Sequence, residues 1–303
     1  MRMLVVHGDI TTQHADAIVN ATDPSLLGGA VHRRGDPAVL AECRALRASA
    51  YRNGLPFGRA VATTGGELRA RWVIHTAGPV WSAGEDRSAL LASCYRESLR
   101  IAGELGAGSV AFPAISTGAG GWPPGDAAAI AVRALRAAPT GVEEVRFVTF
   151  TPEVRTAFTE VVTSDENIAA GLAAHPAQRW RRLFAAVDAL TPADRAVTWE
   201  TPEHQLPYPR YTEGFWQVVR LLAELDVVVP FDWGTWSRDT PLHPEGRGLA
   251  GAPVADAARL ATAYIRGERF CEGTLESGLG NGALDAIFDR LRRWFTEEHG
   301  GGR

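Results

Sequence analysis

Two short glycine-containing turns have the composition of an anion-binding backbone. The first turn ends in Gly28 and Gly29, and the second covers residues 116–121, with the sequence STGAGG. Each turn lies between a strand-like apolar run and a helix-like segment, so the backbone N–H groups of both turns can face the same ligand. Either turn taken singly is better explained as a plain strand-to-helix connection. Together, the two turns suit a diphosphate.

Four further motifs flank these turns in a fixed order. They are GDIT at residues 8–11, ADAIVNA at 15–21, VIHTAGP at 73–79 and VAFPAI at 110–115. In this order the set resembles the macrodomain family, whose members bind ADP-ribose, and within it the hydrolase-type branch. The resemblance covers residues 1–162. A chance match of several ordered motifs is improbable compared with that of one isolated glycine pattern.

The resemblance implies a role for each part of an ADP-ribose site. Asp9 is at the position that accepts a hydrogen bond from the adenine amine, and the Ile10 N–H serves a ring nitrogen. The alternative is that Asp9 only caps a turn. Asn20 is at the position that faces the distal ribose, with an Asx turn after the strand as its alternative. The predicted diphosphate donors are the backbone N–H groups of Gly28, Gly29, Ser116, Thr117, Gly118, Ala119, Gly120 and Gly121.

The chain departs from the hydrolase-type pattern in three places, all at the same end of the ligand. About five residues are missing after Gly29, and with them the aspartate that orients the attacking water in that branch. Asp23 stands in place of a second asparagine, and Gly120 in place of an aromatic residue that packs on the distal ribose. Asn20 and Asp23 are therefore the remaining candidate catalytic residues, with Asp23 as a substitute carboxylate.

Three functions follow from these features. The first is a reader of ADP-ribosylated substrates with weak hydrolysis, because the adenosine and diphosphate contacts can remain when the hydrolytic end is lost. The second is a fully active ADP-ribosyl hydrolase that removes mono-ADP-ribose from protein or nucleic acid. The third is a degenerate scaffold for a protein-interaction domain. An exposed cluster of four aromatic residues would favour this third function: Tyr208, Tyr211, Trp233 and Trp236.

The pattern of apolar residues predicts two domains. Residues 1–162 alternate short Val-, Ile- and Phe-rich runs with amphipathic segments, which predicts an α/β sandwich. The resemblance specifies a three-layer α/β/α macrodomain with a mixed sheet. Residues 163–177 lose strand character and are predicted to be a linker. Residues 178–303 are predicted to form a smaller, mainly α-helical domain, whose VVVPFDW and RGERFCEGTL stretches resemble an uncharacterised bacterial domain family.

Tryptophan is concentrated in the predicted helical domain. Six of the nine tryptophans lie there, at positions 180, 199, 216, 233, 236 and 294. Because a tryptophan side chain buries a large area, we expect these rings to fill a compact core.

The composition limits the compartment and the partners. A net charge of −4 argues against strong nucleic-acid binding, which requires clustered Lys and Arg. Three cysteines without CxxC spacing indicate a reducing compartment, and no cofactor or metal is predicted because the histidines lack ligand spacing. No apolar run approaches the ~20 residues of a membrane-spanning helix, and the first apolar stretch is too short for a signal peptide.

The expectation is a cytoplasmic bacterial protein. Its expected partner is ADP-ribose or an ADP-ribosylated macromolecule, and the helical domain is a candidate site for a protein partner.

Overall fold

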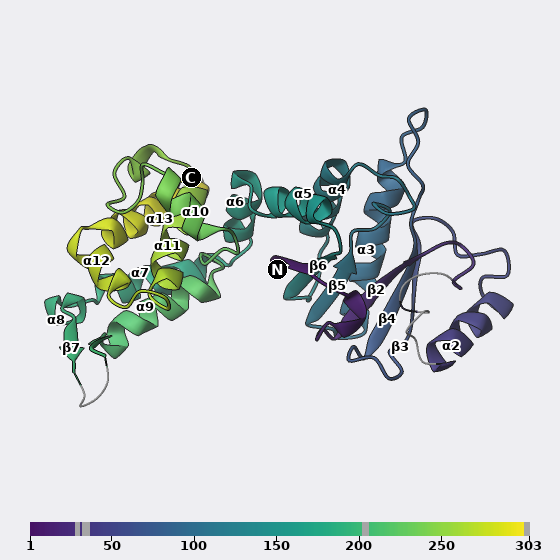
Figure 1. Ribbon diagram of the computed structural model, residues 1–303, viewed down its shortest axis with the longest axis horizontal. Helices are drawn as coiled ribbons and strands as arrows, with labels where there is room; N and C mark the ends of the chain where they lie inside the picture. Colours follow the sequence, from purple (N-terminus) through teal and green to yellow (C-terminus); the bar gives the residue numbers. More distant parts are fainter. Residues whose placement is uncertain (28–30, 32–36, 202–205, 300–303) are drawn as a thin grey trace. The chain divides into compact units, whose positions relative to one another are not determined.

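The protein is folded into two compact units, Met1–Val162 and Thr163–Arg303 (Figure 1). The structure, a computed structural model, describes residues 1–27, 31, 37–201 and 206–299. No helix in these ranges has the length and apolar character needed to cross a bilayer.

The first unit contains a mixed sheet of six strands. The strands are β1 (Arg2–His7), β2 (Ala17–Thr22), β3 (Ala60–Thr64), β4 (Trp72–Ala77), β5 (Ser109–Pro113) and β6 (Glu144–Thr149). Their order is β1-β6-β5-β2-β4-β3, and all neighbours are parallel except β3 and β4. The carboxyl ends of β1, β6, β5, β2 and β4 therefore share one edge of the sheet, the carboxyl edge, and their amino ends share the opposite, amino edge. The predicted mixed sheet is confirmed.

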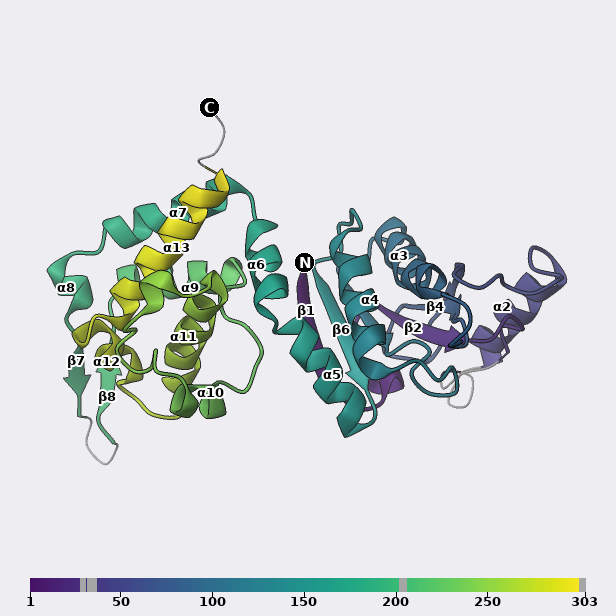
Figure 2. The same cartoon turned by 90° about the horizontal axis from the view of Figure 1, so that it is seen from above.

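Helices cover both faces of this sheet (Figures 1 and 2). They are α2 (Pro37–Ala48), α3 (Ser88–Glu104), α4 (Pro124–Arg136) and α5 (Pro152–Val162), with a 3₁₀ turn η1 (Ile10–Thr12) after β1. Successive side chains of a strand point to opposite faces, so β2 buries Val19 with α3, α4 and α5 and buries Ile18 with Val39 of α2. Both faces are thus apolar and covered, which gives the predicted three layers.

Asp16 joins two strands at the amino edge. Its Oδ2 atom accepts hydrogen bonds from the backbone N–H groups of Gly108 and Ser109 and from Ser109 Oγ, each at 3.0 Å. The Asp16 N–H in turn donates to Ser109 Oγ at 2.9 Å. Burial raises the pKa of the Asp16 carboxyl, but the hydrogen bonds from Ser109 and Gly108 outweigh this effect, and the pKa lies below its ordinary value. The start of β2 is therefore held to the start of β5 by an ionised side chain.

The second unit is mainly helical, as predicted. Its helices are α6 (Asp165–Ala173), α7 (Ala177–Asp188), α8 (Pro192–Arg195), α9 (Glu213–Glu224), α10 (Trp233–Asp239), α11 (Val254–Gly267), α12 (Thr274–Gly280) and α13 (Ala283–His299). Two short antiparallel strands, β7 (Thr198–Glu200) and β8 (Tyr208–Arg210), and a 3₁₀ turn η2 (Leu249–Gly251) complete it.

The segment 163–177, predicted to be a linker, contains helix α6. Ser164 caps the helix by accepting a hydrogen bond from the Asn167 N–H. Ile168 and Leu172 are buried in the core of the second unit. The segment lacks strand character because residues 165–173 form this helix. The helix belongs to the second unit and packs in its core through these apolar positions.

The tryptophans of the second unit are only partly core residues. Trp180 and Trp294 are buried, with their ring centroids 5.1 Å apart, as predicted. Trp199 is 45% exposed and donates from Nε1 to Glu276 at 2.9 Å, so the core prediction is wrong for this residue. The other aromatic residues singled out in the sequence are half-buried rather than gathered in an exposed cluster: Tyr208, Tyr211, Trp216, Trp233 and Trp236. This burial does not favour the scaffold function.

Candidate ligand-binding site

The predicted site residues gather at the carboxyl edge of the first unit. Asp9 follows β1, Asn20 lies near the end of β2, and the loop of residues 114–121 follows β5. In the strand order, β5 lies between β1–β6 on one side and β2 on the other, so the loop lies between Asp9 and Asn20. Ligands of open α/β sheets bind in crevices outside the carboxyl ends of strands. Gly28 and Gly29, the other half of the predicted diphosphate site, lie outside the described residues.

The backbone of the second glycine turn has an unusual shape. Ser116 has a φ of 66°, in the left-handed region that non-glycine residues seldom adopt, and its carbonyl accepts from the Trp122 N–H at 3.0 Å. Gly120 lies so close to Ser116 that a Cβ atom there would be 2.6 Å from the Ser116 carbonyl oxygen. This turn therefore has no room at position 120 for the aromatic residue that the hydrolase-type pattern carries.

The hydrogen bonds of this turn divide the predicted donors into two groups. The Thr117 N–H donates to the Ala114 carbonyl at 3.3 Å, and the Gly121 N–H donates to the Gly118 carbonyl at 3.0 Å. These two groups build the turn itself. Within the part of the chain that the structure describes, no hydrogen bond occupies the other four predicted N–H groups of this turn, on Ser116, Gly118, Ala119 and Gly120. These four N–H groups remain available to donate to an anion on the turn.

Gly78 packs the end of β4 against the same turn. Its N–H donates to the Thr22 carbonyl at 3.3 Å, and a Cβ atom on Gly78 would lie 2.6 Å from Ser116 Oγ. The ends of β2 and β4 and the turn after β5 are therefore in direct contact.

Asp9 shapes the turn after β1. Its Oδ1 atom accepts from the Thr11 N–H at 2.8 Å and from Thr11 Oγ1 at 2.7 Å, and Ile10 is buried. Asp9 therefore caps this turn, as the alternative interpretation predicted. A carboxylate accepts up to about four hydrogen bonds, so a cap and a ligand contact are compatible.

Asn20 belongs to a buried chain of hydrogen bonds across three strands. Its Nδ2 atom is 3.2 Å from His75 Nδ1, and His75 Nε2 is 2.9 Å from Thr63 Oγ1, which donates to the Thr64 carbonyl. These partners assign the imidazole proton to Nε2, because Nδ1 accepts from the amide. The alternative placed Asn20 in a turn after the strand, but the residue lies within β2 and is 2% exposed.

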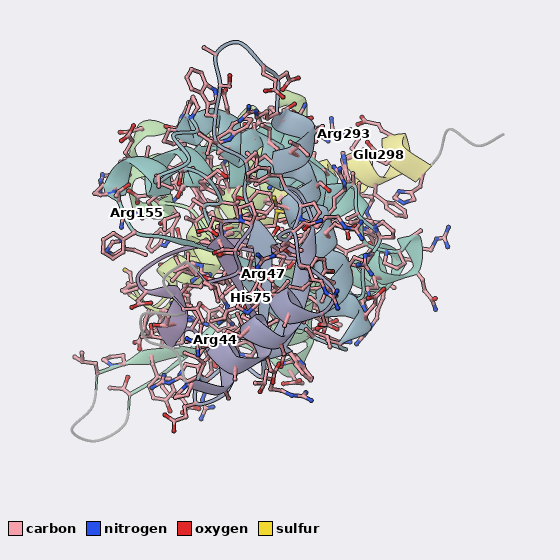
Figure 3. The ribbon with its side chains drawn as sticks, turned by 90° about the vertical axis from the view of Figure 1, so that its right-hand side faces the viewer. Arg44, Arg47, His75, Arg155, Arg293 and Glu298 are labelled. Carbon is pink, nitrogen blue, oxygen red and sulfur yellow. The ribbon has the colours of Figure 1, made fainter. Side chains whose placement is uncertain are left out.

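Helix α2 covers the His75 end of this hydrogen-bond network. Cys43 Sγ lies 3.5 Å from His75 Nε2, and burial together with Glu42 raises the pKa of the Cys43 thiol to about 11. Cys43 is therefore a neutral thiol at physiological pH. Figure 3 views the first unit from the side of α2 and labels His75 with Arg44 and Arg47 of that helix. His75 is a buried structural histidine, as the sequence indicates.

Asp23 is exposed beyond the end of β2. Its Oδ1 atom accepts from the Ser25 N–H at 2.6 Å, so one carboxylate oxygen shapes a turn. The chain segment after it, in which the hydrolase-type aspartate is missing, lies mostly outside the described residues. Among the residues that are described, no group of three or more His, Cys, Asp or Glu side chains is arranged to hold a metal ion.

Phe150 is a candidate site residue that sequence reasoning missed. It follows β6 directly and is 80% exposed, and the preceding Thr149 carbonyl accepts from the Gly8 N–H of the β1 end at 3.1 Å. An exposed aromatic face can stack on a nucleobase. The signal in the sequence is an aromatic residue after an apolar strand. Its nearness to Asp9 depends on the pairing of β1 with β6, which the sequence alone does not show.

Comparisons with known proteins agree with this architecture. Residues 19–131 match the family described as Macro domain, and residues 175–297 match the family of unknown function DUF6508. A macro domain-containing protein encoded in the sno 5' region of Streptomyces nogalater is 72% identical over 151 residues, which cover 48% of this chain and 83% of that protein. The chain belongs to the macrodomain family.

Two further relatives match about half of the chain. An Enterobacter cloacae protein named O-acetyl-ADP-ribose deacetylase is 43% identical over 169 residues, covering 52% of this chain and 92% of that protein. The solved structure of a mutant Oceanobacillus iheyensis macrodomain matches with a TM-score of 0.50 and 36% identity, covering 52% of this chain and 89% of the other. The mixed sheet of the first unit is therefore a macrodomain sheet.

Proposed function

We propose that the macrodomain binds ADP-ribose at the carboxyl edge of its sheet and acts as a reader of ADP-ribosylated substrates with at most weak hydrolysis. The observation that carries the proposal is the turn after β5. In the described part of the chain, its N–H groups on Ser116, Gly118, Ala119 and Gly120 have no partner, and they lie between Asp9 and Asn20. Clustered backbone N–H groups of this kind bind phosphates. The relative named O-acetyl-ADP-ribose deacetylase supports a ligand of this class.

The strand order gives the ligand a direction. Asp9 and Phe150, at the ends of the paired strands β1 and β6, suit adenine, because a carboxylate accepts from its amine and an aromatic ring stacks on its face. The turn after β5 suits the diphosphate. Asn20, in the next strand β2, is proposed to face the hydroxyl groups of the distal ribose, although the residue is 2% exposed and its Nδ2 atom is bonded to His75. The parts of ADP-ribose follow one another in the same order as these strand ends.

The described part of the distal end of this site is poorly equipped to activate water. Among the described residues, Asp23 is the remaining candidate carboxylate near Asn20, and one of its oxygens already accepts a hydrogen bond from the Ser25 N–H. Loss of a positioned general base typically costs about 10²- to 10⁴-fold in rate. A reader with slow turnover is therefore favoured over the fully active hydrolase.

Isothermal titration of ADP-ribose into the full-length protein tests the binding proposal. We expect saturable binding with one molecule of ADP-ribose per chain. Absence of heat from binding, in a protein that gives a folded circular dichroism spectrum, would remove the proposed function.

A release assay then separates the reader from the hydrolase. A mono-ADP-ribosylated protein is incubated with the wild type and with Asp23→Asn, and free ADP-ribose is measured over time. We expect slow release by the wild type and slower release by the variant. Equal rates would mean that Asp23 is not the catalytic carboxylate, and rapid turnover by the wild type would support the fully active hydrolase instead.

A further inference from the structure

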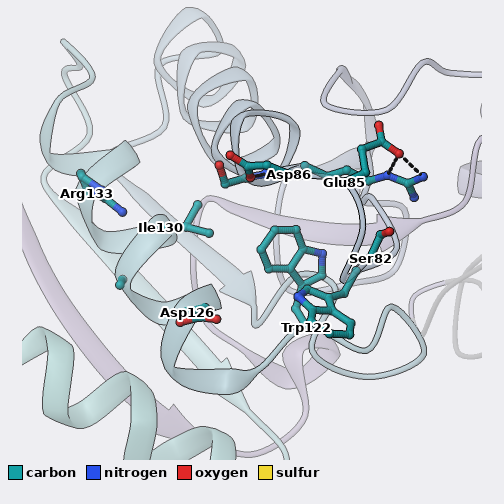
Figure 4. A pocket seen from close by; sticks show the side chains of 11 residues that line it. Ser82, Glu85, Asp86, Trp122, Asp126, Ile130 and Arg133 are labelled. Atoms are coloured by element: carbon teal, nitrogen blue, oxygen red, sulfur yellow. Dashed lines mark hydrogen bonds and ion pairs between the residues drawn. The ribbon is translucent and has the colours of Figure 1, made fainter.

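A cleft of the macrodomain opens beside the turn after β5. It has a volume of about 320 Å³ and lies between helix α4 and the loop that joins β4 to α3 (Figure 4). Asp126 and Ile130 line it from α4, and Glu85 and Asp86 line it from the loop. None of these residues has a role in the ADP-ribose site proposed above.

The loop that lines the cleft is hydrogen-bonded to the turn after β5 and to the residue that follows it, next to the proposed diphosphate site. The Trp81 N–H donates to the Gly120 carbonyl at 2.7 Å, and Trp122 Nε1 donates to the Pro79 carbonyl at 3.0 Å. The loop of residues 78–87 continues from β4, which pairs with β2, the strand that carries Asn20. The cleft therefore lies at the same, carboxyl edge of the sheet where the distal ribose and its attached substrate are proposed to lie, on the face that α3 and α4 cover.

Aromatic and aliphatic side chains form the apolar part of the cleft. Trp81 is 43% exposed, so a large part of its indole ring meets solvent, whereas Trp122 and Ile130 are buried and form the floor. Large exposed aromatic rings beside a hollow are typical of contact sites for a partner. A flat, electron-rich indole surface also attracts cations such as a guanidinium group.

The charges of the cleft favour a cation over a phosphate. Three carboxylates line it, Glu85, Asp86 and Asp126, against the two guanidinium groups of Arg87 and Arg133. Arg87 is held by Glu85 at 2.6 Å and by the Val80 carbonyl at 3.1 Å. The lining has a net charge of −1, because the Arg87–Glu85 pair leaves the carboxylates of Asp86 and Asp126 against the guanidinium group of Arg133.

We infer that this cleft binds an arginine or lysine side chain of the polypeptide that carries ADP-ribose. The inference rests on the proposed function, because ADP-ribose on the neighbouring turn is what brings the polypeptide to the cleft. The cationic side chain lies on the Trp81 ring, and Asp126 accepts its hydrogen bonds. An ADP-ribosylated nucleic acid would instead bring phosphates toward a lining whose net charge is −1.

The test compares ligands on the full-length protein. The probes are free ADP-ribose, peptides that carry ADP-ribose through a non-hydrolysable linkage with Arg, Ala or Glu beside it, and an ADP-ribosylated oligonucleotide. We expect the Arg peptide to bind about 5- to 10-fold more tightly than the Ala peptide. Trp81→Ala and Asp126→Asn should remove this difference and leave the affinity for free ADP-ribose unchanged.

Reversing the charge at position 126 distinguishes the inference from a folding defect, because a misfolded protein would lose the preference rather than reverse it. Asp126→Lys should reverse the preference, so that the Glu peptide binds more tightly than the Arg peptide. Matched controls are Phe57→Ala, an aromatic residue exposed to a similar extent, and Glu153→Lys, an acidic residue in the first turn of α5. Both controls should keep the preference for Arg.

The outcomes distinguish the inference from the proposed function. If free ADP-ribose binds but the flanking residue has no effect, or the oligonucleotide binds more tightly than the Arg peptide, the inference about the cleft is wrong and the proposed function stands. If free ADP-ribose does not bind to the wild type, both are wrong.

Discussion

The two edges of the macrodomain sheet use their carboxylates in different ways. At the amino edge, Asp16 bonds to Gly108 and Ser109, which are 92 and 93 positions away in the chain. At the carboxyl edge, Asp9 and Asp23 each accept a hydrogen bond from a backbone N–H only two positions away. Bonds of the first kind join strands, whereas bonds of the second kind shape single turns. We propose that stability and ligand binding are separated between the edges, so variants at each should change one property and not the other.

Substitution at the adenine end should give the largest change in affinity. Asp9→Ala removes a charged acceptor, and hydrogen bonds to charged groups contribute about 1.5–3 kcal/mol, so we expect ADP-ribose affinity to fall about 10- to 100-fold. Calorimetric titration measures this change. The free energy of unfolding should fall by only about 1 kcal/mol, as for loss of a turn cap. Unchanged affinity would place adenine elsewhere.

Substitution at the amino edge should change stability and leave binding unchanged. Asp16→Asn replaces a charged acceptor of three hydrogen bonds with a neutral amide, and we expect the free energy of unfolding to fall by about 2 kcal/mol at neutral pH. Chemical denaturation monitors this loss, and the ADP-ribose titration serves as the control. A variant that loses affinity while remaining folded would contradict the separation between the edges.

The same variant has a defined pH dependence. The folded pKa of Asp16 is below its ordinary value, so its ionised form stabilises the fold above the unfolded pKa of about 3.9, and this contribution is lost as the pH falls through the folded pKa. The stability difference between wild type and Asp16→Asn should therefore shrink in acid. A difference that stays constant from neutral pH to below the folded pKa would mean that the carboxylate charge is not responsible.

Phe150→Ala should weaken binding by a smaller factor than Asp9→Ala. Stacking of a base on an aromatic ring contributes about 1–3 kcal/mol, and a ring on one face of adenine at an open edge should lie near the lower limit, at about 10-fold in affinity. Phe270→Ala is the matched control in the second unit, because both rings are 80% exposed. Equal effects of the two substitutions, measured by titration, would argue against stacking by Phe150.

The smallest expected effect on affinity is that of adding one methyl group at position 120 of the turn after β5. Gly120→Ala forces Ser116 and its neighbours to shift, because the new Cβ would otherwise lie 2.6 Å from a backbone oxygen. Displaced donors should lower ADP-ribose affinity by about 3- to 5-fold, since each hydrogen bond contributes on the order of 1 kcal/mol. Gly125→Ala, where a Cβ meets nothing within 4 Å, is the control. An affinity for Gly120→Ala equal to that of the wild type would mean that the turn does not hold the ligand in this shape.

The sequence predicted the elements better than their contacts. Apolar runs and glycine turns located the strands, because local composition encodes strands and turns directly. The ordered motifs singled out Asp9, Asn20 and residues 116–121, which the structure brings to one edge of the sheet. The proposed role of Phe150 depends on β1 lying beside β6, a pairing between residues far apart in the chain. The N–H groups of Thr117 and Gly121 are used inside the turn, which only its three-dimensional path reveals. Helix α6 was missed because its pattern of buried positions is short.

Backbone amide chemical shifts measured with and without saturating ADP-ribose test the separation between the edges most directly. In ¹H–¹⁵N spectra of the labelled full-length protein, we predict large shifts for Ile10, Ser116, Gly118 and Gly120 at the carboxyl edge. Ser109 at the amino edge, whose N–H is bonded to Asp16, should stay unchanged. Shifts centred on Ser109, or confined to the second unit, would contradict the account.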